Sequence, residues 1–126
     1  MRPIILTVDD AKAIRDLAEK TLHAFDCEAT SATNGYNAFF AIERQRPDLI
    51  LLDISMPVMD GIETLSRLKG APEIADIPVI MLTSRADHRI IPKLPGMGAK
   101  DTLMKPFTES ALLEKIRGVL PLKPNR

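Results

Sequence analysis

Neither sign of charge is in excess in this 126-residue chain, because seventeen Lys and Arg residues balance seventeen Asp and Glu residues. A formal net charge of +0 gives no electrostatic basis for binding nucleic acid or another polyanion, so no nucleic-acid partner is expected. Long apolar runs are also missing: none approaches the roughly 18–20 residues that cross a bilayer. The amino terminus enters a strand-like run at once. Secreted and membrane-anchored proteins are therefore disfavoured.

Cysteine is almost absent. Cys27 stands alone, so it has no partner for an internal disulfide, and we expect a small buried thiol in a protein of the reducing cytoplasm. The apolar share of 45% and the charged share of 27% are those of an ordinary globular protein. This length predicts one domain with one core, over residues 1–121, followed by a frayed tail at 122–126.

Short apolar runs alternate with longer amphipathic patterns along the chain. The runs are rich in β-branched residues and predict buried strands at 4–8, 48–52 and 79–82, with weaker candidates at 28–32 and 101–104. Apolar residues at helical spacing predict helices within 14–25, 38–42, 62–68 and 112–120. This alternation is typical of an α/β fold, a doubly wound parallel sheet with helices on both faces.

One connection departs from the pattern. A fourth helix is expected between the strands near 82 and 101, yet residues 89–98 contain Pro92, Pro95, Gly96 and Gly98. Pro95 cannot donate a backbone hydrogen bond, and a proline inside a helix costs about 3 kcal/mol. We therefore expect this helix to be short, irregular or absent.

Polar side chains gather where the predicted strands end, which is where open parallel sheets bind their ligands. They are Asp9, Asp10, Asp53, Thr83 with Ser84, and Lys105. Neighbouring carboxylates repel each other and need a divalent cation, an ammonium group or protons beside them. Hard oxygen ligands suit Mg²⁺, and a carboxylate beside it can attack a phosphoryl group. Taken singly, each residue also has an ordinary structural role: Asp9 or Asp10 as a helix cap, Thr83 in a turn, and Lys105 as a solvated charge.

The chain resembles the receiver domains of two-component response regulators over nearly its full length. The matching segments are Asp9-Asp10, 51–61, 78–84, 98–101 and 105–107. The resemblance implies a five-stranded parallel sheet of order 2-1-3-4-5, flavodoxin-like (CheY-like), flanked by five helices. It also implies Mg²⁺-dependent phosphorylation of an aspartate by a histidine kinase, a phosphotransfer protein or a small phosphodonor, and a protein target downstream.

The resemblance assigns a role to each site residue. Asp53 would be the phosphoacceptor, and Asp10, Asp53 and the backbone carbonyl of Ser55 would ligate Mg²⁺, with Asp9 acting mainly through a bound water. Lys105 would pair with the phosphoryl oxygens, and the Thr83 hydroxyl and the Ser84 backbone amide would donate hydrogen bonds to them. A cis peptide would link Lys105 and Pro106.

One departure concerns the output. The family usually carries an aromatic residue three positions before the lysine, where this chain has Thr102, and the irregular fourth helix adjoins it. These changes are either neutral or the mark of a different output route.

We expect a stand-alone signalling receiver, a monomer or weak dimer and not an enzyme, because the chain ends just after the last helix. A docking module with lost or altered phosphorylation switching is the alternative. A small aspartyl-phosphate phosphatase is disfavoured, because Asp53-Ile54-Ser55 lacks the second acid.

Overall fold

A single five-stranded parallel sheet organises the computed structural model, which describes residues 2–125. Its strands are β1 (Ile4–Val8), β2 (Glu28–Ala32), β3 (Leu49–Asp53), β4 (Val79–Thr83) and β5 (Asp101–Met104). Their order in the sheet is β2-β1-β3-β4-β5. The predicted doubly wound, flavodoxin-like topology is confirmed, with strand ends within a residue of those expected.

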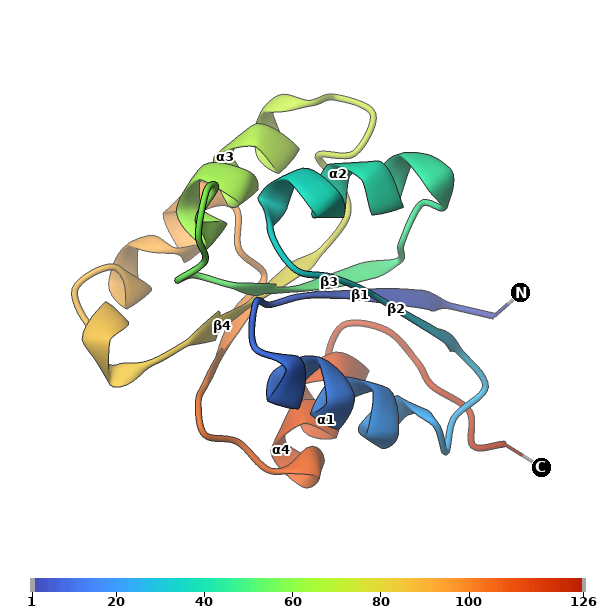
Figure 1. Cartoon of the computed structure of the whole chain (residues 1–126). Coiled ribbons are helices and arrows are strands. Elements are labelled where there is room, and N and C mark those ends of the chain that lie inside the picture. Colours follow the sequence, from blue (N-terminus) through green and yellow to red (C-terminus); the bar gives the residue numbers. More distant parts are fainter. Residues whose placement is uncertain (1, 126) are drawn as a thin grey trace.

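Helices cover both faces of the sheet (Figure 1). α2 (Gly35–Arg44) and α3 (Gly61–Gly70) lie on one face, and α1 (Lys12–Leu22) and α4 (Glu109–Arg117) lie on the other. Side chains of Asn34, Asp60 and Thr108 accept backbone N–H bonds at the starts of α2, α3 and α4, where the amides have no partner within the helix. Within residues 2–125, every helix is too short or too polar to span a bilayer.

The strands alternate their side chains between two apolar layers. In β1, Ile5 packs with α1 and α4, whereas Leu6 and Val8 pack with α2 and α3. In β3, Leu49 and Leu51 face the first layer, and Ile50 and Leu52 the second. This period of two makes both faces of the central strands apolar, as crossover helices on both sides require. Cys27 is a buried thiol in the first layer, as predicted.

The connection between β4 and β5 is the irregular one. Instead of an α-helix it contains three 3₁₀ turns, η1 (Arg85–Asp87), η2 (Ile91–Lys93) and η3 (Pro95–Met97). Pro92 and Pro95 each lie in the first turn of a 3₁₀ segment, where the missing N–H is not needed. Leu94, fully buried, anchors the segment to the core, and Gly98 ends it at φ 101°. The prediction of a short or irregular fourth helix is confirmed, and four α-helices take the place of the five that the resemblance implied.

The expectation of a frayed tail at 122–126 is wrong over residues 122–125; Arg126 lies outside the described residues. Leu122 is buried in the α1–α4 layer, and Pro124 forms an isolated antiparallel bridge with Phe25. The amides of Asp26 and Asn125 donate to the carbonyls of Lys123 and Ala24. The proline content of the tail led to the wrong expectation. Leu122 anchors the tail in the core, although it lies outside the apolar pattern of the predicted helix within 112–120.

Replacing Leu122 by Ala should lower the free energy of unfolding by about 2–3 kcal/mol, because it empties a buried site in the α1–α4 layer. Lys123→Ala is the matched control, since the Lys123 side chain is exposed and its backbone carbonyl remains. Urea unfolding of both variants measures the difference. Equal stabilities would show that the tail contributes nothing to the core.

Candidate functional site

The expected site residues meet at the carboxyl edge of the sheet. β1 and β3 pair with Val8 opposite Leu52, so the residues that follow, Asp9 and Asp53, leave neighbouring strands at the same level. β4 and β5 pair with Thr83 opposite Met104, which brings Ser84 and Lys105 to that level too. The parallel register thus gathers side chains that lie up to 96 positions apart in sequence.

Asp9, Asp10 and Asp53 form a compact group of carboxylates. One oxygen from each lies within 4.8 Å of the other two. Asp9 is 0% exposed and Asp53 is 5% exposed, whereas Asp10 is open to solvent. Oδ1 of Asp9 accepts the Ala11 amide at 2.9 Å, which fixes the orientation of that carboxylate.

Lys105 supplies the positive charge within the group. Its Nζ donates to Asp53 Oδ1 at 3.0 Å and lies 2.6 Å from Asp9 Oδ2, in ion-pair contact without hydrogen-bond geometry. The Lys105–Pro106 peptide is cis, as the resemblance implied. Burial works to lower the pKa of Lys105, but the two carboxylates outweigh it and hold that pKa above its ordinary value. The ammonium group therefore stays charged at neutral pH.

One ammonium group does not balance three carboxylates. Burial raises the pKa of Asp53 to about 6; the bond from Lys105 opposes this rise, and the charge of Asp9 adds to it. Asp9 Oδ2 is buried and accepts no hydrogen bond. Three carboxylates beside one ammonium group leave an excess of negative charge, which fits a divalent cation, and carboxylate oxygens are the ligands that Mg²⁺ prefers.

Two donors end β4, and both are engaged by the protein itself. The Thr83 hydroxyl is buried and donates to the Leu103 carbonyl across a long 3.5 Å. The Ser84 amide donates to Asp87 Oδ2 at 2.7 Å, and the Ser84 hydroxyl donates to the same oxygen at 3.2 Å. Asp87 was not among the residues predicted for the site. The Ser-x-x-Asp spacing, that of a capping box, was the signal for it.

The loop after Asp53 closes tightly on the site. Ser55 lies exposed on it, two residues beyond Asp53, and Val58 takes a left-handed φ of 72° at its exposed apex. The Gly61 amide donates to the Ile54 carbonyl at 2.7 Å. A Cβ on Gly61 would overlap the Asp53 carbonyl and lie 2.7 Å from Ile54 Cα, so glycine is required for this close approach.

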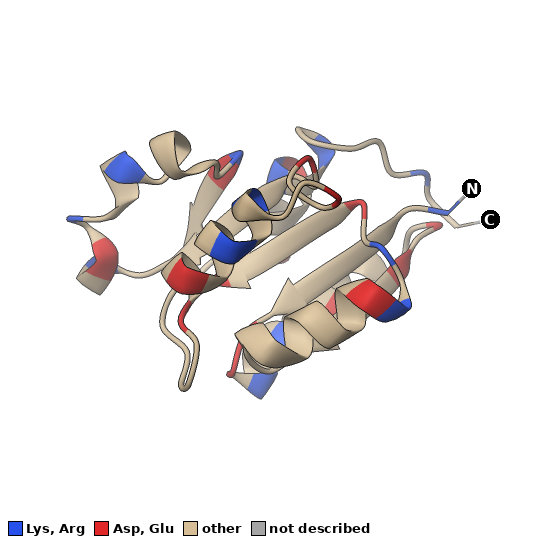
Figure 2. Cartoon of the chain, turned by 90° about the horizontal axis from the view of Figure 1, so that it is seen from above, with Lys and Arg blue, Asp and Glu red and all other residues tan. Residues whose placement is uncertain are grey.

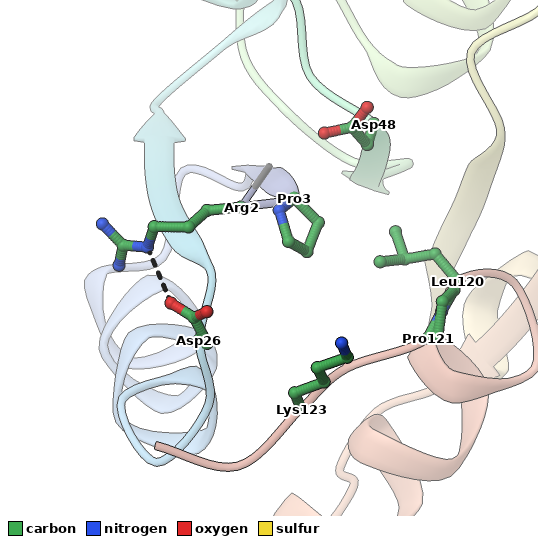
Figure 3. A pocket seen from close by; sticks show the side chains of 7 residues that line it. All are labelled: Arg2, Pro3, Asp26, Asp48, Leu120, Pro121 and Lys123. Carbon is green, nitrogen blue, oxygen red and sulfur yellow. Dashed lines mark ion pairs between the residues drawn. The ribbon is translucent and has the colours of Figure 1, made fainter. Parts of the chain in front are cut away.

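A separate hollow of about 520 Å³ lies at the opposite, amino edge of the sheet (Figure 3). Arg2, Asp26, Asp48 and Lys123 contribute to its lining, and Arg2 pairs with Asp26 at 3.1 Å. It holds none of the predicted site residues. Figure 2 shows acidic and basic residues interspersed around the molecule.

The comparisons with known proteins agree with this geometry. The sequence model of the response regulator receiver domain matches residues 5–117. The chain belongs to the response regulator receiver domain family. It is 36% identical over 125 residues to sporulation initiation phosphotransferase F of Bacillus subtilis, covering 99% of each chain. It is 34% identical over 119 residues to protein PilG of Pseudomonas aeruginosa, covering 93% of this chain and 87% of that protein.

Solved receiver structures share the fold. The chemotaxis protein CheY4 of Vibrio cholerae superposes with a TM-score of 0.87 at 30% identity, over 95% of this chain and 100% of that chain. The receiver family therefore accounts for the order of the strands in the sheet. In the part of the chain that the structure describes, three 3₁₀ turns take the place of the α-helix that the resemblance implied between β4 and β5.

Asp53→Asn should raise the free energy of unfolding at pH 7, without divalent metal, by about 1–3 kcal/mol. The pKa of Asp53, about 6 in the folded protein, lies above its ordinary value of 3.8. The folded protein therefore binds one more proton than the unfolded chain between about pH 4 and pH 6, and its stability falls as the pH rises through this window; below about pH 4 both states are protonated and the cost is absent. At pH 7 the wild type carries the cost of the buried charge, and the amide does not.

Denaturant unfolding at pH 4 and pH 7 in EDTA measures this effect, and the gain should vanish at pH 4. Asp76→Asn, whose side chain is 80% exposed, is the matched control and should change stability by about 0.5 kcal/mol or less. A loss of stability in Asp53→Asn at pH 7 would contradict the charge excess described above.

Gly61→Ala should destabilise the receiver by about 1–3 kcal/mol, because the added methyl group has to displace the backbone at Asp53 and Ile54. Gly70→Ala is the control: its methyl group meets nothing within 4 Å, and alanine favours the helix. Thermal unfolding of the two variants should shift in opposite directions. Equal shifts would show that the loop tolerates a side chain at 61.

Proposed function

We propose that this receiver accepts a phosphoryl group on Asp53 and signals to a protein partner. The observation that carries the proposal is a single arrangement: Asp53 is buried in the carboxylate group and hydrogen-bonded to Lys105 at 3.0 Å. A buried carboxylate next to a fixed ammonium group and two further acids suits phosphoryl transfer, which depends mostly on positioning and on neutralising charge.

In the proposed step an oxygen of the Asp53 carboxylate attacks the phosphorus of the donor. The new bond joins this oxygen to phosphorus, and the bond from phosphorus to the leaving group breaks, its electron pair going to the leaving group. The product is an acyl phosphate on Asp53. Lys105 Nζ, which now bonds Asp53 Oδ1, is within reach of the incoming phosphoryl oxygens.

Asp9, Asp10, Asp53 and the Ser55 carbonyl are the proposed ligands for Mg²⁺. When bound, Mg²⁺ would neutralise carboxylate and phosphoryl charge during transfer. Asp9 remains oriented by the Ala11 amide, and its Oδ2 lies 2.6 Å from Lys105 Nζ, on the side of the carboxylate group. The Thr83 hydroxyl would leave its long bond to Leu103 and donate to a phosphoryl oxygen, as the Ser84 amide would.

A histidine kinase or a phosphotransfer protein is the proposed phosphodonor, and a protein is the proposed target. Similarity to a relative named as a sporulation phosphotransferase supports a relay role. We propose that the chain is a cytoplasmic signalling domain and not an enzyme acting on other substrates; each polar group predicted for the site has a role in the proposed transfer of one phosphoryl group.

A docking module without phosphorylation switching is the second candidate. The observation that favours it is the small Thr102, which is half-buried beside the irregular connection. The complete set of carboxylates with Lys105 favours the phosphoacceptor instead.

Incubation with acetyl phosphate and Mg²⁺ should add the mass of one phosphoryl group to the intact protein. Asp53→Asn should add none, because its amide is not a nucleophile, and Lys105→Met should slow the gain by at least about tenfold through the loss of a charge-assisted bond. Time-resolved intact-mass spectrometry measures all three.

Asp48→Asn is the control, because this aspartate lies at the amino edge of the sheet, away from the carboxylate group (Figure 3). It should be phosphorylated at the wild-type rate. A wild type that gains no mass, or a gain that persists in Asp53→Asn, would exclude the proposed function and leave the docking module.

A further inference from the structure

Asp87 accepts two hydrogen bonds from Ser84 at the end of β4. The Ser84 amide lies 2.7 Å from Asp87 Oδ2 and the Ser84 hydroxyl lies 3.2 Å from the same oxygen. The Asp87 side chain is half-buried against this turn, while Arg85, Ala86 and His88 around it are exposed. A carboxylate oxygen of the protein therefore already accepts the Ser84 amide, which the proposed function requires as a donor to a phosphoryl oxygen.

We propose that Asp87 is an internal competitor of the phosphoryl group and couples phosphorylation of Asp53 to the β4–β5 connection. The inference rests on the proposed function. In the unphosphorylated receiver the Ser84 amide binds Asp87; in the phosphorylated receiver it binds a phosphoryl oxygen, and Asp87 is released.

The two states exclude each other for a simple reason. Ser84 has one backbone N–H, and a carboxylate and a phosphoryl group are both charged acceptors that need it in full. If Asp87 stayed in place, two anions would share one donor in a half-buried turn beside the carboxylate group. Binding of the phosphoryl oxygen to Ser84 therefore has to be more favourable in free energy than the Ser84–Asp87 bond that it replaces. Asp87 is thus a positioning residue that lowers the affinity of the site for a phosphoryl group.

Release of Asp87 would change the conformation of the three 3₁₀ turns, because backbone hydrogen bonds link Asp87 to them. The Asp87 amide donates to the Ser84 carbonyl at 3.0 Å, and the Ile90 amide donates to the Asp87 carbonyl at 2.9 Å. Ile90 packs against the core, as does the fully buried Leu94. Movement of η1 would therefore displace the segment between η1 and Leu94. This receiver has the small Thr102 where the family usually has an aromatic residue, so the segment is a second route by which phosphorylation could change the surface.

The test uses beryllium fluoride with Mg²⁺ as a phosphoryl analogue and compares the full-length wild type with Asp87→Ala and Asp87→Asn. Asp87→Ala should bind at least about fivefold more tightly, since the competing charge-assisted bond is gone. Asp87→Asn keeps an oxygen acceptor without the charge and should fall between. Isothermal titration calorimetry measures the three affinities.

Asp48→Asn is the matched control, because Asp48 Oδ2 also accepts a backbone amide, that of Ile4 at 2.8 Å, at the opposite edge of the sheet. Its affinity for the analogue should equal that of the wild type. Thermal unfolding of each variant checks that it is folded before the comparison.

Carbon-13 NMR of the side-chain carboxylates separates competition from a merely structural role. In the wild type, the Asp87 carboxylate signal should shift on binding the analogue, while the Asp48 signal stays. The Ser84 amide should be protected from hydrogen exchange in both states of the wild type and, in Asp87→Ala, only with the analogue bound.

Unchanged or weaker binding in folded Asp87→Ala, or an Asp87 signal that does not move, would overturn the inference while leaving phosphorylation of Asp53 intact. A wild type that neither binds the analogue nor gains mass from acetyl phosphate would instead overturn the proposed function itself.

Discussion

The structure of this receiver depends on an imbalance of charge at one edge of its sheet. Asp9 and Asp53 are buried beside Asp10, and Lys105 is the one ammonium group paired with them among residues 2–125. Burial raises the pKa of Asp53 to about 6, so the ionised carboxylate is destabilised in the folded protein. A cation placed beside the three carboxylates would relieve this cost. The same imbalance lowers the stability of the free protein and supports the proposed binding of a metal ion and a phosphoryl group.

The rest of the fold keeps that imbalance in place. Two apolar layers clamp the central strands from both sides, so the strand ends cannot spread apart to relieve the repulsion. Gly61 has no side chain, which allows the loop after Asp53 to pass close to the Asp53 backbone carbonyl. The Ala11 amide fixes the orientation of the Asp9 carboxylate. Stability far from the site thus maintains an unfavourable arrangement within it, which is a common property of functional sites.

The sequence predicted the strands and the converging carboxylates because both follow from simple rules. Apolar runs mark buried strands, and parallel strands end at one edge. The docked tail escaped prediction because Leu122 is a single apolar residue among prolines, and its partners near Phe25 are about a hundred positions away. The Ser84–Asp87 contact escaped because its spacing is common in turns, and only the geometry shows that it engages a donor of the site.

In the proposed function Asp53, and no other group, takes the phosphoryl group. Borohydride reduces an acyl phosphate to an alcohol, so it would convert a phosphorylated aspartate to homoserine. After treatment with acetyl phosphate, Mg²⁺ and then borohydride, peptide mass spectrometry should find homoserine at position 53 alone. Homoserine at position 9 or 10, or a phosphoryl group retained on a histidine with none at 53, would contradict phosphorylation of Asp53.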